Sequence, residues 1–266
     1  MKFNIYSGAG NIFAFATKPA GVVVNKNFIQ NICRDTKEEF SIDGVVFISK
    51  VSENEYSWDF YNSDGSSAEM CGNAARCAGL HVFEKLSSGI NSFSLKTLAG
   101  TIQISKNDQQ EICVEMPEVK SFGFIETPEP EGVHWLFLDT GVPHVVAYVG
   151  ENSPIEKNKS LLSNIRHSSL LGPRGANVTL ITKQKMGWVS AKTYERGVED
   201  FTRACGTGAV AAAFWKKTSD DVGNQSMVSV EMPGGVLRVD FTGVRPKLSG
   251  PTSKLGVLSL EETKGV

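Results

Sequence analysis

The chain repeats its own order of strands and helix at an interval close to half its length. In the first half, alternation of apolar and polar residues predicts strands over 3–5, 46–48 and 56–60. Small and helix-forming residues then predict a helix over about 71–85. Three short strands follow, at 93–97, 101–105 and 112–116. The second half shows the same order, with strands near 135–138, 144–149, 178–182 and 188–194, a helix over about 205–217, and strands at 227–232 and 236–241. Such a repeat predicts two related units that each mix strands with one helix.

The repeat brings a Cys-Gly pair to the same place in each half. Cys71-Gly72 and Cys205-Gly206 stand 134 residues apart, each at the start of the predicted helix. A helix N-terminus offers N–H groups without intrahelical partners and a partial positive charge, which bind a carboxylate and stabilise a thiolate. A free cysteine is only about 3% thiolate at neutral pH, and this position lowers its pKa. The pattern therefore predicts two activated thiols.

Two such thiols on opposite faces of one carbon could invert its configuration, because a thiolate removes a proton while a thiol returns one. The competing interpretation is that cysteine is a buried apolar side chain, which we expect for Cys33, Cys77 and Cys113. The stretch 206–208 could also suggest a phosphate-binding loop, but it lacks the lysine and spacing of the known nucleotide motifs.

Composition excludes several classes of protein. The chain has 266 residues, of which 41% are apolar and 21% charged, with a formal net charge of −2, so disorder and a polyanionic partner such as nucleic acid are not expected. Apolar stretches are shorter than the roughly 20 residues of a membrane helix, and the first residues alternate like a strand, not a signal peptide. Five cysteines without a CxxC pair and four scattered histidines favour neither disulfides nor a metal site. We expect a cytoplasmic protein that contacts no membrane.

Taken together, the motifs resemble the diaminopimelate epimerase family over nearly the whole chain. Asn73 after Cys-Gly favours this branch over proline racemases, which carry histidine there. The resemblance rests on Ser7-Gly8-Ala9-Gly10-Asn11, Asp43-Gly44, Asn62-Ser63-Asp64-Gly65, Met70-Cys71-Gly72-Asn73, Gly141-Val142-Pro143-His144, Ala176-Asn177-Val178, Tyr194-Glu195-Arg196-Gly197 and Ala204-Cys205-Gly206-Thr207-Gly208.

This resemblance implies an α+β fold of two pseudo-symmetric domains, each a curved antiparallel β-sheet or barrel around a central α-helix, with the active site where the two helix N-termini meet. The implied domains are 1–117 with a C-terminal strand at about 253–266, and 118–252. The implied activity is the conversion of LL-diaminopimelate to meso-diaminopimelate without pyridoxal phosphate, another cofactor or a metal. The partner is a small amino-acid substrate. A homodimer is an expectation that the sequence itself does not show.

By the same resemblance, Cys71 and Cys205 form the acid/base pair, and His144 and Glu195 assist the thiols. The backbone N–H groups of four residues would hold the reacting carboxylate: Gly72, Asn73, Gly206 and Thr207. The far end of the substrate would be held by Asn11, Asn62, Asn177 and Arg196, with Glu195 also at the substrate. Arginine suits this because it binds a carboxylate bidentately, and asparagine supplies a donor and an acceptor.

Departures from the family pattern leave substrate strictness open. Val142 stands where asparagine is frequent, Ile12 replaces a common aspartate, and Ala74 replaces a common glycine. The interval from Glu195 to Cys205 is also about one residue longer than usual. The alternatives are a racemase of another amino acid such as histidine, a non-catalytic amino-acid-binding protein, and a thiol redox protein. The sequence does not show which thiol removes the proton from which stereoisomer.

Overall fold

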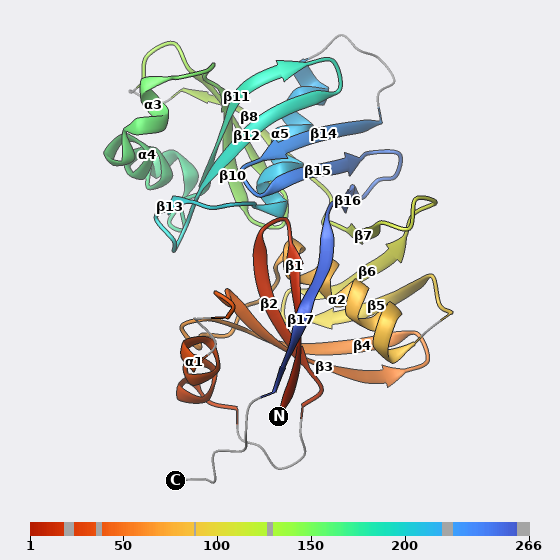
Figure 1. Cartoon of the computed structure of the whole chain (residues 1–266). Helices are drawn as coiled ribbons and strands as arrows, with labels where there is room; N and C mark the ends of the chain where they lie inside the picture. The colour runs from red at the N-terminus through yellow and green to blue at the C-terminus, as the bar shows by residue number, and fades with distance from the viewer. Residues whose placement is uncertain (19–23, 36–38, 88, 127–129, 220–225, 260–266) are drawn as a thin grey trace. The chain divides into compact units, whose positions relative to one another are not determined.

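The computed structural model describes residues 1–18, 24–35, 39–87, 89–126, 130–219 and 226–259. It divides into two compact units, one formed by Met1–Val114 with Gly250–Val266 and the other by Glu115–Ser249 (Figure 1). Among the described helices, none combines the length and apolar character that crossing a membrane requires.

Over its described residues, the first unit has eight strands in the order β17, β1, β2, β3, β4, β5, β6, β7. The C-terminal strand pairs with the N-terminal one, from Lys2 opposite Ser259 to Gly8 opposite Thr252. The elements are β1 (Lys2–Gly8), β2 (Asn11–Ala16), α1 (Lys26–Asp35), β3 (Gly44–Ser52), β4 (Glu55–Asn62), α2 (Gly72–His81), the π-helix η1 (Val82–Leu86), β5 (Ser92–Thr97), β6 (Gly100–Lys106), β7 (Ile112–Glu115) and β17 (Thr252–Ser259).

The second unit repeats this order as β8, β9, β10, β11, β12, β14, β15, β16, and β13 pairs beside β12 as a short addition. Its elements are β8 (Lys120–Glu126), β9 (His134–Asp139), β10 (Pro143–Tyr148), α3 (Pro154–Lys157), α4 (Lys159–Arg166), the 3-10 turn η2 (Ser169–Leu171), β11 (Asn177–Lys185), β12 (Trp188–Glu195), β13 (Asp200–Phe201), α5 (Gly206–Ser219), β14 (Met227–Met232), β15 (Gly235–Asp240) and β16 (Lys247–Ser249).

Each unit contains two parallel pairings, so its sheet is mixed and not purely antiparallel. In the first unit β2 runs parallel to β3 and β4 to β5; in the second, β10 runs parallel to β11 and β12 to β14. Parallel neighbours need a long crossover, usually a helix. Here α1 and α2 make the crossovers of the first unit, while α3 with α4 and then α5 make those of the second. The α+β class and the two-fold repeat are confirmed, and the parallel pairs follow from the crossover helices.

Helices cover both faces of the first sheet. Successive strand residues point to opposite faces. On one face Ala14 packs with Ile29 of α1. On the other, Tyr6 and Phe15 contact His81 of α2, with a Tyr6 hydroxyl to His81 Nδ1 distance of 3.1 Å. The strands therefore place α2 against an aromatic layer.

The two crossover helices that begin at the Cys-Gly pairs are buried over most of their surface, and α5 becomes exposed only at its last three residues, 217–219. Six of the ten residues of α2, GNAARCAGLH, are Gly, Ala or Cys, and α5 opens with GTGAVAAA. Small side chains allow close approach: a Cβ on Gly8 of β1 would lie 2.7 Å from the Asn73 carbonyl oxygen. The predicted helix over 71–85 is α only to His81, and its last turn is π-helical. Burial of most of their surface therefore stabilises these helices, and not the burial of a single apolar stripe.

Candidate active site

Cys71 is the N-cap of α2. Its backbone is extended, with φ −143° and ψ 122°, and its carbonyl accepts the first helical bond from Ala75 N at 2.8 Å. The N–H groups of Gly72 and Asn73 precede that bond, so they belong to the helix end that binds anions. The Cys71 side chain is partly exposed. A partly accessible thiol therefore stands at the positive end of a buried helix.

Beneath this helix end, four side chains form one hydrogen-bonded chain. Arg76 Nη2 donates to Asn73 Oδ1 at 2.8 Å, and Asn73 Nδ2 donates to Asn11 Oδ1 at 2.8 Å. Asn11 Nδ2 then donates to Asp43 Oδ2 at 3.2 Å. Guanidinium only donates and carboxylate only accepts, so the chain fixes the orientation of both amides. We call Asn11, Asp43, Cys71, Asn73 and Arg76 the Cys71 cluster.

The remaining candidate of this unit, Asn62, is not part of that chain. It is exposed at the end of β4, where its amide donates to Ser66 Oγ at 3.0 Å and holds the turn that follows. Its register partner on β3 is Gly44, the residue after Asp43. The structure therefore brings Asn62 next to the Cys71 cluster through the pairing of β4 with β3, and its described side-chain hydrogen bond goes to Ser66.

Cys205 begins α5 in a different environment. Its carbonyl accepts the first helical bond from Ala209 N at 2.8 Å, as in α2, but its side chain is buried. The sulfur lies 3.3 Å from Thr207 Oγ1 and accepts the Gly208 N–H at 3.4 Å. Burial, and next the charge of Glu195, raise the pKa of this thiol well above its usual value. Cys205 is therefore held as a thiol.

His144 is the centre of a network around Cys205. Arg196 N donates to Asn177 Oδ1 at 2.8 Å, so the Asn177 amide group faces His144 Nε2 at 3.2 Å and donates to it. Burial lowers the pKa of His144 to about 3, so the ring is neutral and its proton lies on Nδ1, which donates to Thr179 Oγ1 at 3.0 Å. Thr207 Oγ1, 2.9 Å from Nε2, is left to donate to it. The Thr207 hydroxyl thus links Cys205 to a neutral histidine.

Glu195 completes this network. Burial raises the pKa of its carboxyl, and hydrogen bonds from Thr202 and Cys205 act in the opposite direction. The Thr202 hydroxyl donates to Glu195 Oε1. The neighbouring Arg196 places Nη1 3.4 Å from the Arg174 carbonyl. We call the set His144, Asn177, Glu195, Arg196, Cys205 and Thr207 the Cys205 cluster.

Sequence reasoning missed side chains that hold the candidates in place. Asp43, which anchors Asn11, lies in a stretch already notable as Asp43-Gly44, and the aspartate-glycine pair was its signal. Thr179 shares a strand face with Asn177, two residues earlier, so strand alternation could have indicated it. Thr202 had no such signal. The departures Ala74 and Val142 lie in the first turn of α2 and just before β10.

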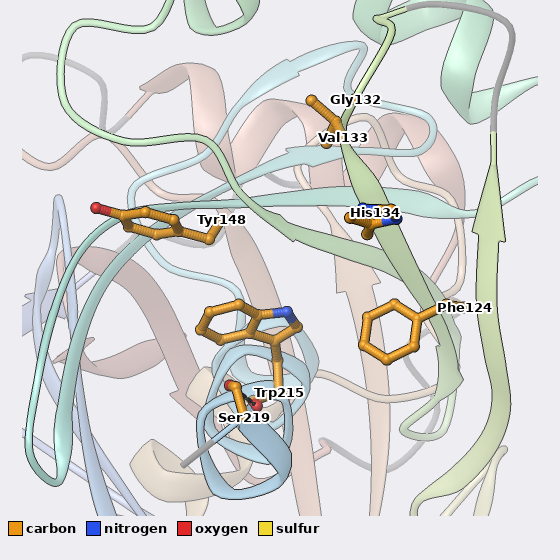
Figure 2. A pocket seen from close by; sticks show the side chains of 7 residues that line it. All are labelled: Phe124, Gly132, Val133, His134, Tyr148, Trp215 and Ser219. Atoms are coloured by element: carbon orange, nitrogen blue, oxygen red, sulfur yellow. Dashed lines mark hydrogen bonds between the residues drawn. The ribbon is translucent and has the colours of Figure 1, made fainter.

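A separate hollow of about 500 Å³ lies at the other end of α5. Figure 2 shows Trp215 and Ser219 of that helix facing Tyr148 and His134. Trp215 stacks on Tyr148 with ring centroids 6.1 Å apart. Ten residues of helix separate Trp215 from Cys205, a rise of about 15 Å. The hollow therefore does not belong to the Cys205 cluster.

Comparison with known proteins agrees with these motifs. A family model described as diaminopimelate epimerase matches residues 3–121 and 136–255. The chain is 32% identical to a diaminopimelate epimerase of Hydrogenobaculum sp. (strain Y04AAS1), over 96% of this chain and 98% of that protein.

Solved structures support the same fold at low identity. A PhzF-family phenazine biosynthesis protein from Enterococcus faecalis superposes with a TM-score of 0.73 at 15% identity, over 97% of this chain and 99% of that one. A hydroxyproline epimerase from Agrobacterium vitis, with bound trans-4-hydroxy-L-proline, gives 0.65 at 15% identity, over 97% and 90%. These likenesses concern the fold alone. The family match across both halves decides the assignment: the chain belongs to the diaminopimelate epimerase family and is an isomerase.

Proposed function

We propose that this chain converts LL-diaminopimelate to meso-diaminopimelate without a cofactor, for lysine and peptidoglycan precursor synthesis. Cys71 and Cys205 act as the two bases: one thiolate removes the α-proton and the other thiol donates a proton to the opposite face. The observation that supports this is that in each unit a buried crossover helix, α2 or α5, begins directly after a cysteine. The proposal requires both thiols to reach one α-carbon.

The reacting carboxylate has a matching set of donors in each unit. Around Cys71 these are the N–H groups of Gly72 and Asn73, and around Cys205 those of Gly206 and Thr207, all preceding the first helical bond. The Asn73 side chain is not assigned to the substrate, because its amide is buried within the Cys71 cluster. Carbanion formation next to a carboxylate needs such donors because negative charge accumulates on its oxygens.

Glu195 and His144 set the proton balance at Cys205 in this scheme. The thiol can donate to Glu195 or to Thr207, whose own proton is directed at neutral His144. When Cys205 gives its proton to the carbanion, the resulting thiolate keeps the Gly208 N–H as a donor, and the Thr207 hydroxyl can rotate its single proton from His144 Nε2 to the sulfur. With these groups around it, Cys205 can act as an acid and then be reprotonated.

The distal end of the substrate is assigned to Asn11, Asn62, Asn177 and Arg196. Asn11 and Asn177 each keep unused hydrogen-bonding capacity after their described bonds, because an amide offers two donors and two lone pairs. The guanidinium of Arg196 has one described hydrogen bond, through Nη1. A second carboxylate, such as diaminopimelate carries, would suit the rest of its guanidinium.

The second candidate is racemisation of another amino acid such as histidine, because Val142, where the family often has asparagine, removes one polar contact to the distal group of diaminopimelate. We also infer a cytoplasmic location and a homodimer, as the family resemblance implies.

Incubation with LL-diaminopimelate in deuterated water, without pyridoxal phosphate or added metal, tests the proposal. We expect meso-diaminopimelate carrying deuterium at the inverted α-carbon. Exchange into histidine but not diaminopimelate would support the second candidate. Binding without exchange would indicate a non-catalytic protein, and loss of two free thiols on mild oxidation without exchange would indicate a redox protein.

A further inference from the structure

Arg76 is a buried charged residue of the first unit to which the proposed chemistry gives no role. Its side chain is fully buried, yet within the described part of the chain it makes no salt bridge with a carboxylate, and its Nε has no hydrogen-bond partner. A buried charge without a counter-charge costs several kcal/mol. Arginine stays protonated at physiological pH. The first unit therefore maintains a positive charge under α2 at the expense of stability.

The guanidinium is fixed at the cysteine end of the helix. Nη1 donates to the Gly72 carbonyl at 3.4 Å and Nη2 to Asn73 Oδ1 at 2.8 Å, the two residues that follow Cys71. Through Asn73 the hydrogen bonds continue to Asn11 and end on Asp43. The charge is thus held by the first helical turn, whose N–H groups already favour an anion.

The ionisable groups that interact electrostatically with Arg76 are two thiols, Cys77 and Cys71. Cys77 is fully buried, and burial raises its pKa far above the usual range, so it stays neutral. Cys71 is partly exposed and caps the helix. Of the two thiols, Cys71 is the one that can carry the negative charge.

Other groups around α2 do not take this role. Burial keeps the His81 ring neutral, with a pKa of about 4, and raises the pKa of the Tyr6 phenol, so it too is neutral. The single carboxylate on the elements packed most closely against α2, Glu84, is exposed. The titratable groups on α2 and those elements are Cys77 and His81 on α2, Lys2 and Tyr6 on β1, Lys106 on β6, Lys254 on β17, and Glu84 and Lys85 on η1.

We propose that Arg76 is a positioning residue of the Cys71 cluster: its buried guanidinium orients Asn73 and supplies the positive charge against which Cys71 rests as a thiolate. This role rests on the proposed thiol chemistry for its use in catalysis. It goes beyond that chemistry because it assigns to Arg76 the lowering of the Cys71 pKa. A buried charge is weakly screened, so its effect on Cys71 persists at high ionic strength.

The test is the pH dependence of Cys71 alkylation by iodoacetamide, resolved from the other cysteines by peptide mass spectrometry. Arg76→Met removes the charge and keeps an apolar stem of similar length. We expect the apparent pKa of Cys71 to rise by about one unit or more, the size of effect that a nearby opposite charge produces. The rise should be the same at low and high salt. No substrate is present, so failure of the proposed epimerase activity would not alter this readout.

Two further variants separate charge from packing. Arg76→Lys keeps the charge, and we expect at most half the shift seen with Arg76→Met. Lys85→Met removes an equal charge from the exposed end of the same helical segment, and should leave the Cys71 pKa unchanged. An unchanged pKa in Arg76→Met, or an equal rise in Arg76→Lys and Arg76→Met, overturns the proposal. If Arg76→Met does not fold, Arg76→Lys alone decides, because a shift of one unit there contradicts the role of charge.

Discussion

The Cys71 and Cys205 clusters share a backbone and differ in electrostatics. Both cysteines accept the first bond of a buried, small-residue helix, at 2.8 Å in each case. Cys71 is partly exposed and interacts electrostatically with the buried Arg76 guanidinium, whereas Cys205 is buried, and its burial and then the Glu195 charge raise its pKa. A helix N-terminus therefore does not by itself decide whether a thiol is ionised. In the proposed scheme, the surrounding charges would make Cys71 the resting base and Cys205 the resting acid.

Removing either sulfur should have the largest effect. Cys71→Ala and Cys205→Ala each delete one of two acid/base groups, so we expect epimerisation to fall by at least about 10³-fold. The stereochemical assay with LL-diaminopimelate measures this, and circular dichroism checks that the fold is kept. Cys33→Ala, at a thiol outside both clusters, is the control and should be active. Substantial activity in either single variant would falsify the two-thiol scheme.

The next largest effect should come from Arg196 of the Cys205 cluster, which we assign to the distal carboxylate of the substrate. Arg196→Ala removes a cation that we assign to the second carboxylate, and a charge-assisted pair contributes about 1.5–3 kcal/mol, so kcat/KM should drop about 10- to 100-fold. Arg34→Ala, on exposed α1, is the matched control. Equal activity of Arg196→Ala on diaminopimelate would move the assignment toward another amino acid.

The hydroxyl that links Cys205 to His144 should have a smaller effect. Thr207→Val keeps the shape of the side chain and removes both hydroxyl contacts, at 3.3 and 2.9 Å. We expect kcat to decrease about fivefold, since one net hydrogen bond is worth about 1 kcal/mol. KM should change little because the Thr207 N–H remains. A change in KM alone would place the hydroxyl at the substrate and not at the thiol.

Each unit also buries one neutral histidine. Its effect, on how the free energy of unfolding depends on pH, should be the smallest of those predicted. His144 and His81 have pKa values lowered from 6.5 to about 3 and about 4. The unfolded chain binds these protons first as pH falls below about 6.5, so the folded state loses stability in that direction. Between pH 7.5 and 5.5 each should contribute a loss of about 1 kcal/mol in the free energy of unfolding. Urea titrations of His81→Gln and His144→Gln should each show a weaker pH dependence than the native chain; an unchanged dependence contradicts the neutral assignment.

Much of this arrangement could be predicted from the sequence because the repeat is visible in local patterns. Alternation located most of the strands, and the Cys-Gly pairs marked the starts of α2 and α5. The short helices α1 and α4 were not predicted, although their apolar residues recur at helical spacing. Arg76 was also missed, because an arginine inside a helical motif is usually solvent-exposed, and only the packed structure reveals its burial.

The division of roles between the two thiols can be measured directly in the unmodified protein. Alkylation of Cys71 and Cys205, followed separately across pH by peptide mass spectrometry, reports the apparent pKa of each thiol independently of its accessibility. We predict that Cys71 titrates below about 8.5, the value of a free cysteine, and Cys205 well above it. A Cys205 that titrates at lower pH than Cys71 would contradict the account.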